Sequence, residues 1–210
     1  MHTESTVRHK AVWGWAGGAA ILALALAGGA GCGNTDSNSP SFIMVDTLTA
    51  QRGCTNDPIA NSLQSDVYTL GSPCEDTGAI TLRLGLRDPG SIGGAILPGP
   101  INYVSVTHYR VIYSRSDGHN TPGVDVPYPI EGGMSFTVLP GANSGTFVLV
   151  RAQAKLEAPL RGLIGLGAQA VISTIAEVTV YGTDQANNTV SATGYITVTF
   201  ADWADPKNIG

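Results

Sequence analysis

Alternation of apolar and polar residues with a period of two runs through most of the chain after residue 40, and it limits the possible folds more than any other pattern. The clearest run is residues 190–200, where Val, Ala, Ile and Phe alternate with Ser, Thr and Tyr. Successive side chains of a β-strand point to opposite faces, so such a run predicts a strand with one buried face. Further runs, the last three less regular, lie at 176–181, 80–87, 134–138, 103–114, 146–155 and 41–49.

These runs predict an all-β domain of about seven strands over residues 41–210, with long loops and almost no helix. Strands that bury one face are typical of antiparallel sheets. Two such sheets hide their apolar faces by packing against each other, so we expect an antiparallel two-sheet sandwich.

The last hairpin resembles a known one. Tyr181 to Asn188, running into Thr189-Val190-Ser191-Ala192, is similar to the closing hairpin of bacterial immunoglobulin-like and fibronectin type III-like domains, whose turns often read Asp-x-Ala-Gly-Asn. Asn187 stands where Gly is usual, and Asn tolerates positive φ. The resemblance implies an immunoglobulin-like sandwich, although the Cys…Trp…Cys core of true immunoglobulin domains is missing. A turn braced by Asx side chains accounts for Asp184, Asn187 and Asn188 without a calcium ion.

The N-terminus has the zones of an export signal: basic Arg8 and Lys10, an uncharged stretch, and small residues before Cys32. Gly29-Ala30-Gly31-Cys32 resembles the lipobox of bacterial lipoproteins, with Gly29 where that family usually has Leu. The resemblance implies a signal peptide at 1–31, an acylated Cys32 as membrane anchor and, because Gly33 follows instead of Asp, an outer-membrane location. An ordinary secretory signal or an uncleaved anchor are the alternatives, since the uncharged run is about long enough to span a bilayer.

Residues 32–40 then form the lipidated Cys and a polar tether that cannot bury a core. Eight residues of such a tether span about 16 Å root-mean-square, which would hold the domain close to its membrane.

The cysteine count fits an exported protein. If Cys32 carries lipid, Cys54 and Cys74 remain as one pair, and an oxidising compartment would join them. Their disulfide would contribute about 3 kcal/mol to stability in the chain-entropy model. Two free thiols are the alternative.

Charge indicates which partners to expect. Without the leader, fifteen acidic and nine basic residues leave a net charge of −6. A mildly acidic surface argues against nucleic acid as a partner.

Two irregular stretches are candidates for recognition, because binding residues concentrate on loops. In the first, residues 116–129, the candidate residues are Asp117, His119, Asp125 and Tyr128. The two Asp and the His could offer metal ligands, but their spacing matches no established metal loop, and an Asp-Gly turn in a proline-braced loop explains them. We therefore expect no metal here.

The second stretch, residues 157–167, offers an apolar contact through Leu160, Leu163, Ile164 and Leu166. The first three fall at one-turn helical spacing after Pro159, a residue suited to a helix start. The segment either caps an open end of the sandwich or exposes an apolar patch to a partner or lipid.

No convincing set of catalytic residues is found. Asp76-Thr77-Gly78 matches the tripeptide of aspartic proteases, but that chemistry needs two carboxylates and there is no second copy. No Gly-x-Ser-x-Gly, HExxH or Walker motif occurs, and no cofactor is expected.

The sequence thus favours a non-enzymatic, membrane-tethered envelope lipoprotein that binds another envelope protein or a glycan. A structural accessory subunit of a secretion, pilus or surface assembly is the second hypothesis. A hydrolase of envelope polymers, with Asp76, Asp117 and Asp125 in one cleft, is the third. Fold alone does not choose among them.

Overall fold

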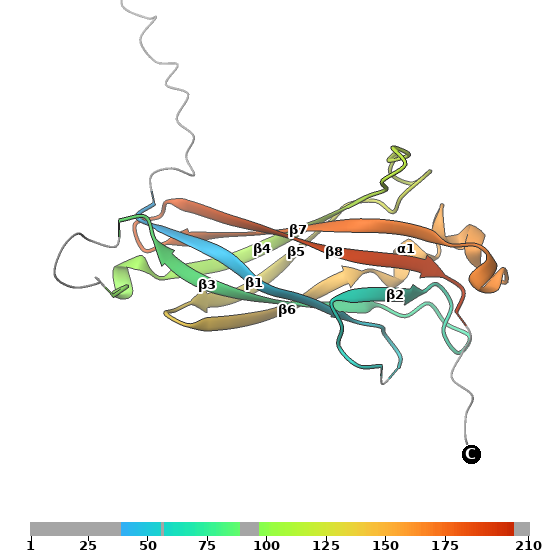
Figure 1. Ribbon diagram of the computed structural model, residues 1–210, viewed down its shortest axis with the longest axis horizontal. Helices are drawn as coiled ribbons and strands as arrows, with labels where there is room; N and C mark the ends of the chain where they lie inside the picture. Colours follow the sequence, from blue (N-terminus) through green and yellow to red (C-terminus); the bar gives the residue numbers. More distant parts are fainter. Residues whose placement is uncertain (1–38, 56, 89–96, 204–210) are drawn as a thin grey trace, which may run out of the picture. The chain divides into compact units, whose positions relative to one another are not determined.

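The computed structural model describes residues 39–55, 57–88 and 97–203, and these form an all-β domain with almost no helix (Figure 1). The predicted signal peptide and Cys32 lie outside the described residues. Within the described residues, eight strands form two sheets. The three-stranded sheet has the order β1 (Ser41–Gln51), β3 (Asp76–Leu86), β6 (Ala142–Val150). The five-stranded sheet has the order β2 (Ser62–Asp66), β8 (Thr189–Ala201), β7 (Ile172–Asp184), β4 (Val104–Ser114), β5 (Ile130–Val138).

The two sheets curl toward each other around one core. Strands β5 and β6 lie side by side where the sheets meet, and β1 contacts β8 on the other side. Alternate residues of both sheets point inward, as the period-two pattern predicts. The fully buried members of this core include Ile80, Leu82, Val111, Leu149, Val178, Val198 and Phe200.

Two buried tyrosines of β4 connect the sheets. The Tyr113 hydroxyl donates a hydrogen bond to the Leu149 carbonyl of β6, and the Val148 N–H donates to the Tyr109 hydroxyl over 3.2 Å. Burial raises the pKa of both phenols, so Tyr113 keeps the proton that it donates. Both hydroxyls are therefore satisfied inside the core, as buried polar groups must be.

Two features differ from the expected sandwich. Strand β2 was not predicted, and it pairs with β8 in parallel, whereas only antiparallel pairs were expected. The expected strand 146–155 ends at Val150, and Ala152–Lys155 forms the short helix α1 instead. The irregularity of 103–114 reflects a register shift between Val106 and His108 that interrupts the alternation.

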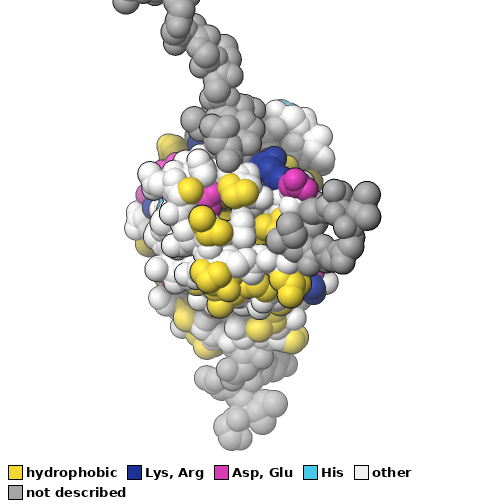
Figure 2. Space-filling model, turned by 90° about the vertical axis from the view of Figure 1, so that its left-hand side faces the viewer, with side chains coloured by type: hydrophobic (Ala, Val, Ile, Leu, Met, Phe, Trp, Pro, Cys, Tyr) yellow, Lys and Arg dark blue, Asp and Glu magenta, His cyan; other side chains and the backbone are white. Residues whose placement is uncertain are grey.

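The strand register defines two ends of the domain. At the N-terminal end lie Ser39, the β5–β6 turn at 139–141 and the β7–β8 turn at 185–188, since Val104 pairs with both Val138 and Asp184. Figure 2 views this end, where separate hydrophobic patches lie among mostly uncharged polar groups. At the opposite end, here called the loop end, Ser114 pairs with Ile175, so segments 115–129 and 151–171 both lie there.

Asp184 organises the β7–β8 turn. Its carboxylate accepts four hydrogen bonds: from the Ala186 and Asn188 N–H groups and the Asn188 side chain at 2.9 Å each, and from Ser39 Oγ at 2.8 Å. Asn187 has a φ of 64°, which its residue type tolerates. Burial raises the pKa of Asp184, but the hydrogen bonds outweigh burial and hold the pKa below its usual value.

We expect Asp184 to stabilise the fold only when it is ionised. Because folding lowers its pKa, its contribution is complete above the unfolded-state pKa near 4 and is lost as pH falls through the lowered value. At pH 7 the free energy of unfolding of the wild type should exceed that of Asp184→Asn by about 1–3 kcal/mol. Urea unfolding of both proteins at pH 7 and near pH 2 should show this gap shrinking. A gap that does not change with pH would contradict this role.

Candidate functional site

Segments 115–129 and 151–171, which contain the stretches 116–129 and 157–167 singled out in the sequence, meet in one groove at the loop end. Gly123 and Tyr128 line it from segment 115–129, and Leu156 to Pro159, Arg161 and Gly162 line it from segment 151–171. Its volume is about 850 Å³. Ligand sites commonly fall between about 300 and 1,000 Å³, so the groove has room for a ligand.

Segment 115–129 is held by its own polar side chains. Asp117 accepts hydrogen bonds from Arg115 Nε and the His119 N–H, each at 3.1 Å, and Asp125 Oδ2 accepts the Thr121 N–H at 3.0 Å. The hydrogen bond from Arg115 lowers the pKa of the exposed Asp117. His119 is exposed, with Nδ1 3.6 Å from Asp117 Oδ1. Asp117, His119 and Asp125 do not line the groove, so three of the four candidate residues shape the loop next to it.

Tyr128 forms the aromatic wall of the groove, and its side chain is 52% exposed. Its ring lies against Gly123, where a Cβ would come within 2.3 Å of Tyr128 Cζ. Gly123 also has a φ of 76°, a conformation that favours glycine. A glycine is therefore required for the ring to take this position.

The four residues of the predicted apolar contact, which belong to the second wall of the groove, do not share one environment. Residues Leu160–Leu163 form a 3₁₀ helix, η3, in which Leu160 and Leu163 are buried and Ile164 packs against the core. These three side chains cap the end of the sandwich, and of the predicted four only Leu166 is largely exposed. Because η3 turns its leucines inward, Arg161 and Gly162 face the groove.

Sequence reasoning did not single out Leu156, Glu157 or Arg161 as contact residues, yet all three line the groove. Leu156 is exposed, and Glu157 Oε1 accepts a hydrogen bond from Gln153 Nε2 at 2.8 Å. For Arg161 the available signal was the helical spacing of Leu160 and Leu163, which places the residues between them on the outer side.

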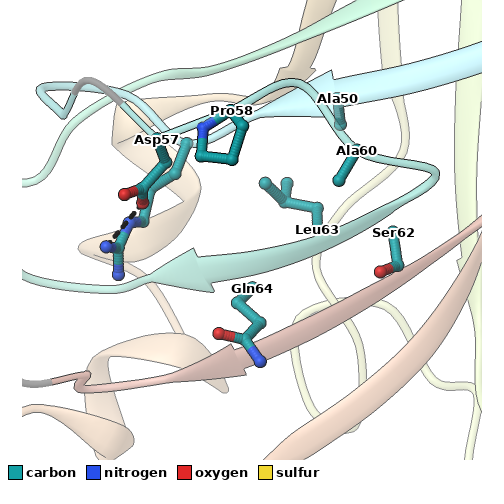
Figure 3. Close-up of a pocket in the computed structure, with 8 residues that line it drawn as sticks. Ala50, Asp57, Pro58, Ala60, Ser62, Leu63 and Gln64 are labelled. Atoms are coloured by element: carbon teal, nitrogen blue, oxygen red, sulfur yellow. Dashed lines mark ion pairs between the residues drawn. The ribbon is translucent and has the colours of Figure 1, made fainter.

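A second, smaller hollow of about 320 Å³ lies between the end of β1, residues 57–60 and β2 (Figure 3). Its polar lining includes Ser62, Gln64 and an ion pair in which Arg52 lies 2.6 Å from Asp57 Oδ2. None of the binding residues predicted from the sequence lines it.

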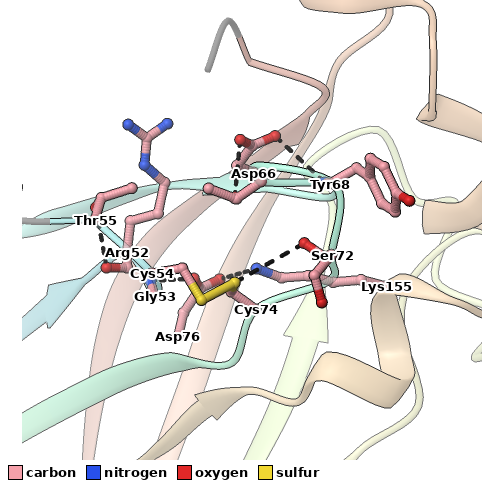
Figure 4. Close-up of a disulfide and its surroundings, with 11 residues drawn as sticks. Arg52, Gly53, Cys54, Thr55, Asp66, Tyr68, Ser72, Cys74, Asp76 and Lys155 are labelled. Atoms are coloured by element: carbon pink, nitrogen blue, oxygen red, sulfur yellow. Dashed lines mark hydrogen bonds and ion pairs between the residues drawn. A yellow bond between two sulfur atoms is a disulfide. The ribbon is translucent and has the colours of Figure 1, made fainter. Parts of the chain in front are cut away.

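A third feature is buried beside the disulfide (Figure 4). Cys54 and Cys74 are bonded, as predicted, with Cα atoms 5.9 Å apart. Next to them, the Asp76 carboxylate and the Lys155 ammonium are fully buried and 2.9 Å apart. Asp76 therefore does not line an open cleft with Asp117 and Asp125, the arrangement that the hydrolase hypothesis requires.

Within residues 39–55, 57–88 and 97–203, no helix is long and apolar enough to cross a membrane, and no three His, Cys, Asp or Glu residues gather as metal ligands. Comparisons of the chain with protein-family models, curated proteins and solved structures found no match.

Proposed function

We propose that this protein is an exported, membrane-tethered binding module whose groove at the loop end holds a segment of another envelope protein or a glycan. The observation that carries the proposal is that two loops far apart in sequence form one groove on a rigid sheet scaffold. Binding sites commonly have this form, with variable loops positioned by a fixed framework.

The lining of the groove suits a ligand with both apolar and polar parts. Tyr128, Leu156 and Pro159 offer apolar surface, and an exposed tyrosine adds a hydroxyl to its ring face. Glu157 and Arg161 place one negative and one positive group among them. A peptide segment or a short run of sugar rings carries the matching combination of apolar faces and hydrogen-bonding groups.

Two observations support an exported, tethered location. The Cys54–Cys74 disulfide is consistent with an oxidising compartment. Ser39 lies at the N-terminal end, where it donates a hydrogen bond to Asp184, while the groove lies at the opposite end of the sheets. A tether joined at Ser39 would leave the groove facing away from the anchored end.

Truncating the Tyr128 side chain should weaken binding strongly and leave the fold intact. Removing a central aromatic anchor commonly costs about 2 kcal/mol of binding, so Tyr128→Ala should reduce crosslinked capture of the partner from intact envelopes by about tenfold or more. Thermal unfolding should change little, because Tyr128 is half exposed. Tyr195→Ala is the matched control, since Tyr195 is 65% exposed on β8 and does not line the groove. Equal capture by Tyr128→Ala and wild type would reject the groove.

A further inference from the structure

Lys155 ends helix α1 and extends its side chain into the interior beside the disulfide (Figure 4). Its Nζ lies 2.9 Å from Asp76 Oδ2, and both side chains are 0% exposed. Lysine is almost never fully buried unless it is paired. Lys155 is therefore buried because it pairs with Asp76.

The amine is poorly satisfied as a cation. An ammonium group has three donors, but apart from the contact with Asp76 no described residue gives Nζ a hydrogen-bond acceptor. Burial lowers the pKa of Lys155 even though the carboxylates of Asp76 and Asp66 act in the opposite direction. Burial thus favours the neutral amine, which is the nucleophilic form of lysine.

The carboxyl group opposite is held at both oxygens. The Gly53 N–H donates to Asp76 Oδ1 at 2.9 Å, and Ser65 Oγ donates to Oδ2 at 2.6 Å. Gly53 can approach only because it lacks a side chain, since a Cβ would lie 2.0 Å from the Glu75 carbonyl oxygen. These bonds fix the Asp76 carboxyl carbon, Cγ, next to the Lys155 amine. Oδ2 is the oxygen nearer the amine, and the other oxygen, Oδ1, accepts the Gly53 N–H.

From this geometry we propose that Lys155 and Asp76 condense into an intramolecular isopeptide bond. Within the pair, one proton passes from Nζ to Oδ2, the neutral Nζ then attacks Cγ, and the Gly53 N–H stabilises the charge that develops on Oδ1. Oδ2 then leaves as water, taking the carboxyl proton and one amine proton, and Nζ–Cγ becomes an amide. Atoms balance without an oxidant, a reductant or a cofactor, and Oδ1 remains the amide oxygen bonded to Gly53.

The interior favours this product over the ion pair. Burying two charges in a low-dielectric interior is costly, and the condensation replaces both with a neutral amide. Both side chains have no exposed surface, so bulk solvent does not contact the reacting groups. The bond would join β3 to the segment after β6 and would lie beside the Cys54–Cys74 bridge, so two covalent links would secure the loop end.

The test is the intact mass of the exported protein after reduction and alkylation. We expect a mass lower by one water than that of the processed chain, and a protease digest containing a branched peptide that joins the Asp76 and Lys155 segments. Lys155→Met should show the full calculated mass and no branched peptide. The wild-type digest alone is decisive even if this variant does not fold.

A wild-type mass without the loss of water, together with tryptic cleavage after Lys155 in the unfolded protein, would overturn the proposal and leave a simple ion pair. This measurement does not involve the groove, so it stands or falls independently of the proposed binding function.

Discussion

Replacing Asp76 by Ala is expected to lower the free energy of unfolding by at least about 3–5 kcal/mol, the usual cost of removing one partner from a buried charged pair, and the loss of the proposed amide would add to this cost. The substitution leaves Lys155 unpaired in the interior and also removes the acceptor for the Gly53 N–H and the Ser65 hydroxyl. Each buried donor that is left without an acceptor adds a desolvation penalty to the cost. Urea unfolding of Asp76→Ala and wild type measures the loss directly.

Adding Lys155→Met to Asp76→Ala provides the control. The second substitution removes the amine that Asp76→Ala leaves without a partner. Replacing both members of a buried charged pair by apolar residues often costs little stability. The free energy of unfolding of the double variant should therefore be at least about 1 kcal/mol higher than that of Asp76→Ala. If Asp76→Ala alone lowered the free energy of unfolding by less than about 1 kcal/mol, this would contradict a buried Asp76 carboxyl group that contacts Lys155, Gly53 and Ser65 together.

Removing the disulfide should produce the next largest loss. Cys54 and Cys74 are 20 residues apart, and the chain-entropy model predicts that opening this loop lowers stability by about 3 kcal/mol. The bridge also positions Gly53, whose N–H binds Asp76, so the loss should not fall below this value. We expect Cys54→Ala with Cys74→Ala to unfold at a clearly lower urea concentration than wild type.

A reductant supplies the matched control for this prediction. Wild type unfolded in its presence should fall to the stability of the double Ala variant, and the variant should not respond to it. Equal stability of the oxidised wild type and the variant would show that the bridge contributes nothing to the fold.

Most strands could be predicted because the core follows local alternation. Ile80 and Leu82, like Val198 and Phe200, point inward at every second residue. Strand β2 was not predicted because its only large apolar residue is Leu63, while its other buried residues are the polar Ser65 and Asp66. Its parallel pairing with β8 depends on contacts distant in sequence, which a local pattern does not report.

The site could be predicted only in part. Loop composition located both walls of the groove, and Tyr128 was among the candidates, but the meeting of the loops depends on the register of β4 with β7. Lys155 left no signal, because a lysine at the end of an alternating run usually reaches solvent. Tertiary context overrode the alternation of Ala152 and Ala154, and α1 carries Lys155 inward to Asp76.

Site-specific photo-crosslinking tests the proposed function most directly. A photoreactive phenylalanine analogue would replace Tyr128 in the groove and, in a second protein, Leu139 in the exposed turn at the N-terminal end. Illumination of intact envelopes should give one defined adduct from position 128 and none from position 139. Adducts from position 139 alone, or none from position 128 in correctly exported protein, would contradict a binding groove at the loop end.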